Sequence, residues 1–441
     1  MPISMVVWIS SYVVALVVAL IIRASLFSNY TMFIGFSLVY TLFPLLVSAG
    51  IQPTYFYNSS LNFRYDLIDV HLIVTGFANL AYCFGRLIGY RRQLQPVPRG
   101  RPAFLRTRVT QIDNIIMLGF MAFAIALTLA GMQFRWGYAR SELVNSLLGQ
   151  GKVILSGVYA YFLVFYGLRP RTIFMLCFVV IITFFEGSRT SLIAMTIGTL
   201  IVAQEDRAFS RLTLLLFTFA FVLYFIFIAM YRIGYDTSSI SQLLDATFPI
   251  FIEGTYGSYM NLQVYDLVTA RPINYTYFLN YLVDPVVFSV PRPLFIAFGL
   301  DKDSFTIFQS WIANETMRLQ EPFAPYGGFF YVAEASAALP YVGPAIVAFG
   351  FALLTAWAEN RRKLTIGGRF QFVIFTIGFS MVFIKHHFAG STRFYFTTFI
   401  VAYGIYLLNH VVAMLLQWRA ERQRAAYAGA DQPAEDASTA I

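Results

Sequence analysis

The sequence predicts an all-α polytopic integral membrane protein. Of its 441 residues, 58% are hydrophobic and only 12% are charged, whereas a soluble domain is about 25% charged. The mean hydropathy is +0.66, and apolar segments recur from Met5 to Gln417. We therefore expect one membrane domain over residues 1–418, because few polar stretches are long enough to fold alone.

Eleven apolar segments are long enough, or nearly so, to cross the hydrocarbon core as helices. The stretch at 231–339, between the eighth and ninth segments, is rich in Tyr, Phe, Pro and Gly. We expect it to form one large ordered loop and not a flexible linker. The predicted spans are residues 5–22, 31–51, 67–90, 114–132, 153–168, 172–186, 190–204, 212–230, 340–357, 370–385 and 394–416.

The arginines predict the orientation of these spans. Residues 91–108 hold six arginines and no acidic residue, which is typical of a cytoplasmic loop. Strict alternation then places the N-terminus and the 231–339 loop outside, and residues 419–441 inside as a cytoplasmic tail without regular structure. Because the net charge of +9 is spread over short loops between spans, we expect the lipid bilayer as a partner and no nucleic acid.

Several arginines remain on the outer face, which the positive-inside rule should deplete. A guanidinium presents five donors that grip phosphate or carboxylate oxygens in pairs, so arginines converging at the membrane surface would suit a lipid-linked diphosphate. Taken singly, each could instead reach lipid headgroups or pair with a neighbouring acid. The candidates are Arg135, Arg140, Arg189, Arg232, Arg292, Arg318 and Arg393.

Titratable side chains on the same face supply candidate proton acceptors. Glu334 precedes the ninth span, and His386 and His387 lie at the outer end of the tenth, shortly before Arg393. Adjacent histidines point in different directions on a helix, so at most one would face a cavity. The sequence shows no metal-ligand spacing and no Gly-rich phosphate loop. We therefore expect neither a metal ion nor another cofactor.

Three short segments share a pattern with a known family. They are FEGSRTSL, SVPRPLF followed by Asp301-Lys302, and YGGFFYVAEASAALPYVGPAIVAFG. In this order they resemble the Wzy-type oligosaccharide repeat-unit polymerases, over approximately residues 150–400. The family's Gly-x-Arg turn, Pro-Arg segment and Gly-rich stretch with Ala-Glu map onto Arg189, Pro291-Arg292, and Gly327-Gly328 with Glu334.

The resemblance implies a metal-independent C-type glycosyltransferase in the bacterial inner membrane. Such a polymerase joins undecaprenyl-diphosphate-linked oligosaccharides into an O-antigen, capsule or exopolysaccharide on the periplasmic face, by inverting transfer. The arginines would bind the diphosphate, with Arg189, Arg292 and Arg393 as the first candidates. Glu334, His386 or His387 would take the proton of the acceptor hydroxyl. A flippase and a chain-length regulator of the same pathway are the protein partners that this interpretation suggests.

Three other interpretations stay open. An O-antigen ligase shares the span count, the outer loop and the lipid-diphosphate donor, but transfers the glycan to lipid A core. A lipid-linked oligosaccharide flippase should carry charge lining a central cavity within many spans, with two related halves. A membrane scaffold would use the outer arginines only in structural pairs.

Overall fold

The computed structural model of the chain is helical throughout the part that it describes. It describes residues 2–49, 65–90, 110–132, 142–186, 190–205, 260–269, 275–290, 292–299, 331–362, 365–385 and 388–430, with shorter pieces between 210 and 223 and between 308 and 314. Within these ranges every helix and strand assignment is helical, which confirms the predicted all-α class.

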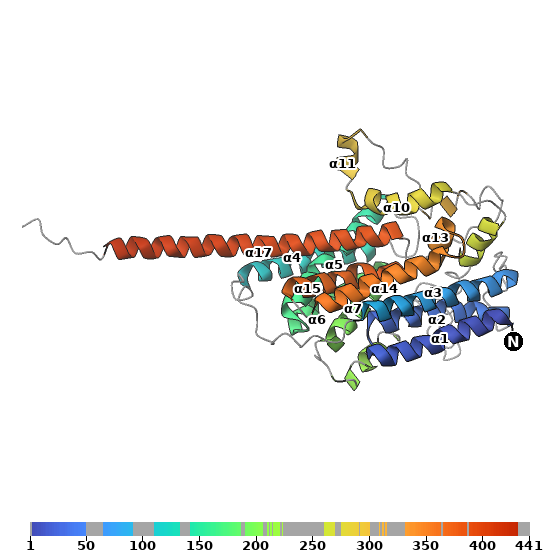
Figure 1. Cartoon of the computed structure of the whole chain (residues 1–441). Helices are drawn as coiled ribbons and strands as arrows, with labels where there is room; N and C mark the ends of the chain where they lie inside the picture. Colours follow the sequence, from blue (N-terminus) through green and yellow to red (C-terminus); the bar gives the residue numbers. More distant parts are fainter. Residues whose placement is uncertain are drawn as a thin grey trace, which may run out of the picture.

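Each of the eleven predicted spans contains helical residues (Figure 1). The elements are α1 (Ile3–Ile22), α2 (Asn29–Ser48), η2 (Tyr65–Leu67), α3 (Ile68–Gly89), α4 (Thr110–Met132), α5 (Glu142–Tyr166), α6 (Pro170–Glu186), α7 (Thr190–Glu205), α10 (Tyr275–Ser289), α11 (Arg292–Ala297), α13 (Tyr331–Ala338), α14 (Gly343–Arg361), α15 (Ile366–Phe375), the π-helix η5 (Thr376–Ser380), α16 (Met381–Lys385) and α17 (Phe388–Ala430).

Length and composition support a membrane location. Among the described residues, five helices are long and apolar enough to cross a membrane: Ile3–Ile22, Asn29–Leu46, Ile68–Gly89, Gly367–Ile384 and Phe388–Arg424. Large apolar side chains on α1 and α17 are exposed, such as Leu20 at 79% and Ile400 at 62%. Surfaces of this kind suit lipid and not water. The predicted number of eleven spans stays a prediction.

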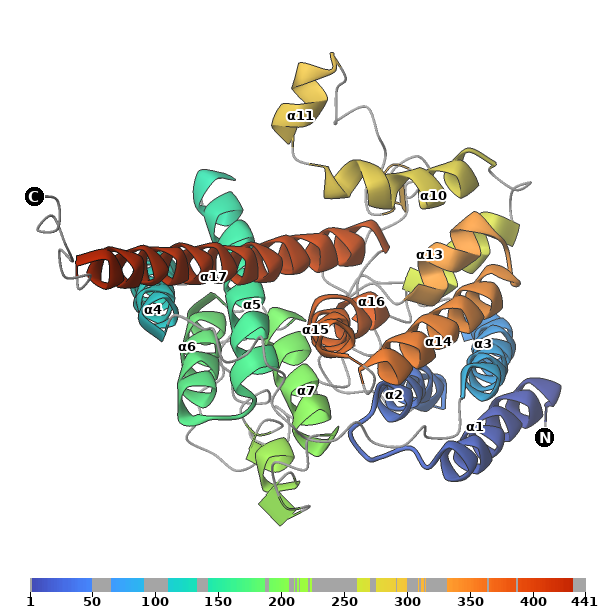
Figure 2. The ribbon, with the colours of Figure 1, turned by 60° about the vertical axis from the view of Figure 1, so that its left-hand side comes forward.

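Small residues bring α3 and α14 into close contact, side by side in Figure 2. An added Cβ on Gly85 would lie 2.8 Å from the Ala352 Cβ, and one on Gly89 would lie 2.4 Å from the Ala356 Cβ. Both pairs repeat at a spacing of four, so the two helices run parallel with their backbones close together. This is the small-xxx-small packing of membrane helices.

The helix α1 also runs parallel to α3. Ser4 donates to the Asp69 carboxylate, and about two to three turns further along both helices, Asn79 donates to Ser11 at 3.4 Å. The strict alternation of spans predicts this relative direction. Which end of the bundle faces the cytoplasm stays a prediction from the arginines.

The C-terminal helix corrects one expectation. The sequence predicts residues 419–441 as a tail without regular structure, but α17 continues as helix to Ala430 and extends well beyond its neighbours (Figure 1). Residues 419–430 are rich in Ala, Arg, Glu and Gln, which favour helix, and they extend one that already exists. Gln417 also donates to Glu421 one turn later. Residues 431–441 lie outside the described part of the chain.

The described pieces of the 231–339 loop are helices that gather near one end of the bundle. They are residues 260–269, α10, α11 and α13. Figure 2 shows α10 lying across the start of α17 and beside α13. Residues 260–269, α10 and α13 share a small buried cluster to which Met260, Phe308 and Ala337 belong. These three pieces are therefore packed together, whereas Ile296 of α11 is 66% exposed. The single large ordered loop stays a prediction.

Candidate functional site

The structure places only part of the predicted site. Glu334 and Arg393 are described with their side chains, and Arg292 begins α11 although its side chain lies outside the described set. The other candidates lie outside the described residues. They are Arg135, Arg140, Arg189, Arg232, Arg318, His386 and His387.

Glu334 is a buried carboxylate that contacts the first residue of α17. Its side chain on α13 is 3% exposed, and its Oε2 accepts a hydrogen bond from the backbone N–H of Phe388 at 2.5 Å. The first N–H groups of a helix have no partner within the helix. A carboxylate there also interacts favourably with the helix dipole. Glu334 therefore caps α17 from another helix.

This contact joins α13 to α17, the helix that carries Arg393. His386 and His387 directly precede Phe388 in the chain, but they lie outside the described residues. Arg393 follows on α17 itself, somewhat more than one turn after Phe388, with an exposed side chain.

Tyr281 of α10 covers the same helix start. Its ring stacks on that of Phe388 with centroids 5.3 Å apart. Burial raises the pKa of the Tyr281 phenol well above its usual value, and the charge of Glu334 raises it further. The phenol is therefore a neutral hydrogen-bond donor at physiological pH.

Asp284 is a second buried acid of the loop, and the sequence offers it as one of the candidate carboxylates on the outer face, ranked below Glu334. It lies one turn after Tyr281 on α10 and is 2% exposed. Burial raises the pKa of its carboxyl from 3.8 to about 7. Its Oδ1 has no hydrogen-bond partner among the described residues. The sequence shows an Asp-Pro pair in an apolar run, but nothing that predicts its burial.

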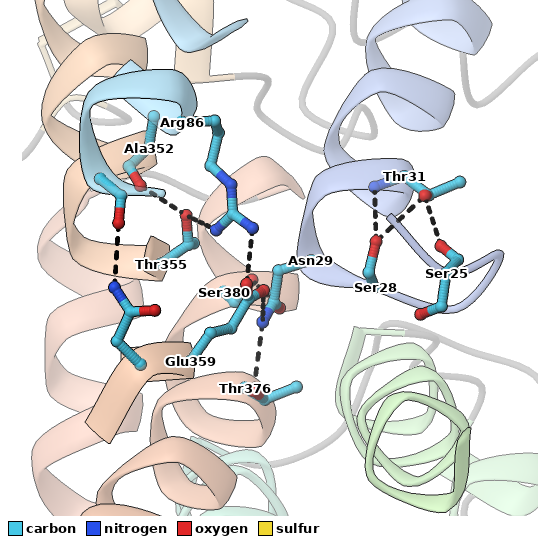
Figure 3. Close-up of polar contacts among 12 residues, drawn as sticks. Ser25, Ser28, Asn29, Thr31, Arg86, Ala352, Thr355, Glu359, Thr376 and Ser380 are labelled. Carbon is cyan, nitrogen blue, oxygen red and sulfur yellow. Dashed lines mark hydrogen bonds and ion pairs between the residues drawn. The ribbon is translucent and has the colours of Figure 1, made fainter. Parts of the chain in front are cut away.

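A polar network at the other end of α3 was not predicted at all (Figure 3). Arg86 donates to Glu359 at 2.5 Å and to Thr355 at 3.0 Å. Asn29 of α2 donates to Glu359 at 3.4 Å, and its side-chain oxygen accepts from Ser380 of the π-helix at 2.8 Å. The network joins α2, α3, α14 and η5. A π-helix inside an α-helix is often found at functional sites.

Arg86 ends a longer polar stripe along α3. The residues His71, Thr75, Asn79, Tyr82 and Arg86 recur every three or four positions, and none is more than 6% exposed. Such spacing places them on one helix face. Through them α3 hydrogen-bonds α1, α2, α14 and residues 260–269. Polar residues at this helical spacing within an apolar span are the sequence signal that could have identified these side chains. Such a pattern indicates contacts between helices.

A third buried acid joins α4, α5 and α17. Asp113 is fully buried and accepts hydrogen bonds from Tyr161 at 3.0 Å, Tyr166 at 2.5 Å and Asn409 at 3.0 Å. Asp113 is in the first turn of α4, and the tyrosines are in the last turns of α5. These donors satisfy the carboxylate, so the cluster holds three helices together.

No metal site is found in the part of the chain that the structure describes. No group of three or more His, Cys, Asp or Glu side chains there could hold a metal ion. Comparison with family models, with curated proteins and with solved structures finds no match to this chain. The function must therefore be inferred from its own residues.

Proposed function

We propose that this protein is a membrane glycosyltransferase that polymerises lipid-diphosphate-linked oligosaccharide repeat units on the periplasmic face of the inner membrane. The observation that carries the proposal is the contact of Glu334 with the start of α17, since α17 also carries Arg393. The three segments that resemble the Wzy-type polymerases add to it. An O-antigen ligase is the nearest alternative, because it uses the same class of donor.

Arg393 is the described residue best suited to meet a diphosphate. Its guanidinium is exposed, and it lies near the N-terminal end of α17, where the helix dipole favours negative charge. In the transfer, the anomeric C–O bond to the diphosphate breaks and negative charge grows on the leaving phosphate. An arginine placed there stabilises the transition state more than the ground state.

The acceptor half of the reaction needs a base. A hydroxyl of the incoming repeat unit loses its proton to the base, and its oxygen forms the new bond to the anomeric carbon as the diphosphate leaves. A single displacement of this kind inverts the configuration at that carbon. Glu334, His386 and His387 remain the candidates from the sequence, and of these Glu334 is the one whose contact with the start of α17 is described.

The buried charges at the opposite end of the bundle do not favour a flippase. A transporter is expected to place charge along a cavity within its spans. Arg86 and Glu359 lie in the last turns of α3 and α14, and Asp113 lies in the first turn of α4. Each has its partner within the bundle.

The test is reconstitution without nucleotide or metal. The full chain in nanodiscs receives a synthetic polyprenyl-diphosphate repeat unit and a chelator, and the products are resolved as a glycan ladder. We expect a ladder from the wild type, and a rate about 100-fold lower from Arg393→Ala, the loss typical of removing one group that stabilises transition-state charge. Arg422→Ala, an exposed arginine at the far end of the same helix, is the matched control.

The possible outcomes separate the alternatives. Transfer to a lipid A core acceptor without extension would make the protein a ligase. Movement of the lipid between leaflets without transfer would make it a flippase. A ladder of equal rate from Arg393→Ala and Arg422→Ala would keep the polymerase but remove Arg393 from its site.

A further inference from the structure

The helix α10 exposes apolar side chains and buries an acidic one. Its apolar side chains Leu279, Leu282 and Val286 are 56 to 64% exposed, while the acid Asp284 is buried. Tyr281 lies on the same side as Asp284, one turn away, and that side packs against α13 and α17. Asp284 therefore lies on the side of α10 that packs against α13 and α17.

Burying this carboxyl costs free energy that nothing described there offsets. An acid in an apolar setting without a hydrogen bond is strongly disfavoured, and the Asp284 Oδ1 has no partner among the described residues. Its neighbour Pro285 lies inside α10 and has no N–H to donate. A buried polar atom of this kind calls for an explanation, and a functional role is one of the few available.

Glu334, on the neighbouring helix α13, is less free to act. Its Oε2 is occupied by the Phe388 N–H, and losing that bond would uncap α17. The two acids therefore have different roles, because Glu334 positions the start of α17 while Asp284 offers an oxygen that no described group occupies.

We propose that Asp284 is the base that takes the proton of the acceptor hydroxyl in the glycosyl transfer. The inference rests on the proposed function and deepens it. The hydroxyl proton moves to the Asp284 carboxylate, the hydroxyl oxygen bonds to the anomeric carbon, and the anomeric bond to the diphosphate breaks with both electrons on the leaving oxygen. The proton then passes from Asp284 to solvent, and the carboxylate is restored.

Burial also suits Asp284 to proton transfer. A carboxyl whose pKa is about 7 is a better proton acceptor than an ordinary aspartate and is still ionised for much of the time near neutral pH. The described titratable or charged side chains on the packed helices are Tyr281 on α10, Tyr331 and Glu334 on α13, and Arg393 and Tyr395 near the start of α17. Residues 260–269 add Tyr265 and Asp266. His386 and His387, just before α17, lie outside the described residues.

The test follows the rate of ladder formation in the full-length protein. We expect Asp284→Asn to lower the rate about 100-fold or more, the contribution typical of a general base. Binding of the donor lipid should change less than about twofold, because the proposed partner of Asp284 is the acceptor hydroxyl and not the donor's diphosphate. Val286→Ala, on the exposed side of α10, should leave the rate unchanged.

In the wild type the rate of ladder formation should rise with pH and level off above about pH 7. Asp284→Glu should keep part of the rate and move this midpoint.

The outcomes distinguish the two proposals. A wild-type ladder together with an Asp284→Asn ladder of equal rate would overturn the role of Asp284 and leave the polymerase standing. A wild type that binds the donor but forms no ladder would overturn both. If Asp284→Asn fails to fold, the wild-type profile decides, because a flat rate between about pH 5.5 and 8.5 would exclude a base with this pKa.

Discussion

The guanidinium of Arg86 meets the carboxylate of Glu359 at 2.5 Å, where the last turns of α3 and α14 lie side by side. The Arg86 side chain is 7% exposed and the Glu359 side chain 20%. The pair is thus a partly buried one that ties together two parallel helices. Removing one partner of such a pair leaves the other charge uncompensated, whereas replacing both need not be costly.

We therefore expect Glu359→Leu to destabilise the protein by at most about 3 kcal/mol, since Glu359 keeps some access to solvent. The double variant Arg86→Met, Glu359→Leu should recover most of that loss. Thermal unfolding in detergent measures both. A double variant less stable than Glu359→Leu alone would show that Arg86 stabilises the protein through other contacts, such as the one with Thr355, and is not an uncompensated charge.

The close contact of α3 with α14 predicts a steric effect. Gly89→Leu places a large side chain where even a Cβ would lie 2.4 Å from that of Ala356. The helices must separate, at a cost of about 1 to 3 kcal/mol or more. The control is Gly350→Ala on α14, since an added Cβ there meets nothing within 4 Å. Equal unfolding temperatures for the two variants would contradict the observed packing.

The capping role of Glu334 can be separated from its charge. Glu334→Gln keeps an oxygen that accepts from the Phe388 N–H, whereas Glu334→Leu removes it and costs about 1 to 3 kcal/mol for the unsatisfied donor. Hydrogen exchange of the first turn of α17 should therefore quicken in the leucine variant and change little in the glutamine variant. Fast exchange in both would mean that the negative charge, and not the hydrogen bond, holds the turn.

The sequence predicts the helices well because their signal is local. Apolar runs longer than about 18 residues, such as residues 5–22 and 67–90, identify α1 and α3 within a few residues. The helix at 419–430 is harder to predict, because the change from apolar to basic residues suggests that the ordered helix ends where the membrane span ends. Ala and Arg nevertheless continue a helix readily.

The candidate site is predicted less completely, for a physical reason. The sequence identifies Glu334 through a motif, but its bond to Phe388 joins residues 54 positions apart. The burial of Asp284 depends on α13 and α17, which follow much later in the chain. Arg86 and Glu359 are 273 positions apart, so single-sequence reasoning treats them as unrelated charges at span ends.

The raised pKa of Asp284 predicts how the stability of the protein depends on pH. Its pKa is raised from 3.8 to about 7 in the folded state. Between these values the unfolded chain releases the proton while the folded one keeps it, so rising pH favours unfolding. The stability that the protonated Asp284 contributes is fully present below about pH 4 and is lost by about pH 7. At about 1.4 kcal/mol per pKa unit, this contribution is at most about 4 kcal/mol.

The variant Asp284→Asn should remove this pH dependence from unfolding midpoints measured between about pH 5 and 8. Glu421→Gln, on the exposed end of α17, should keep it. A wild-type midpoint that does not fall over this range would show that Asp284 ionises as freely in the folded protein as in the unfolded one.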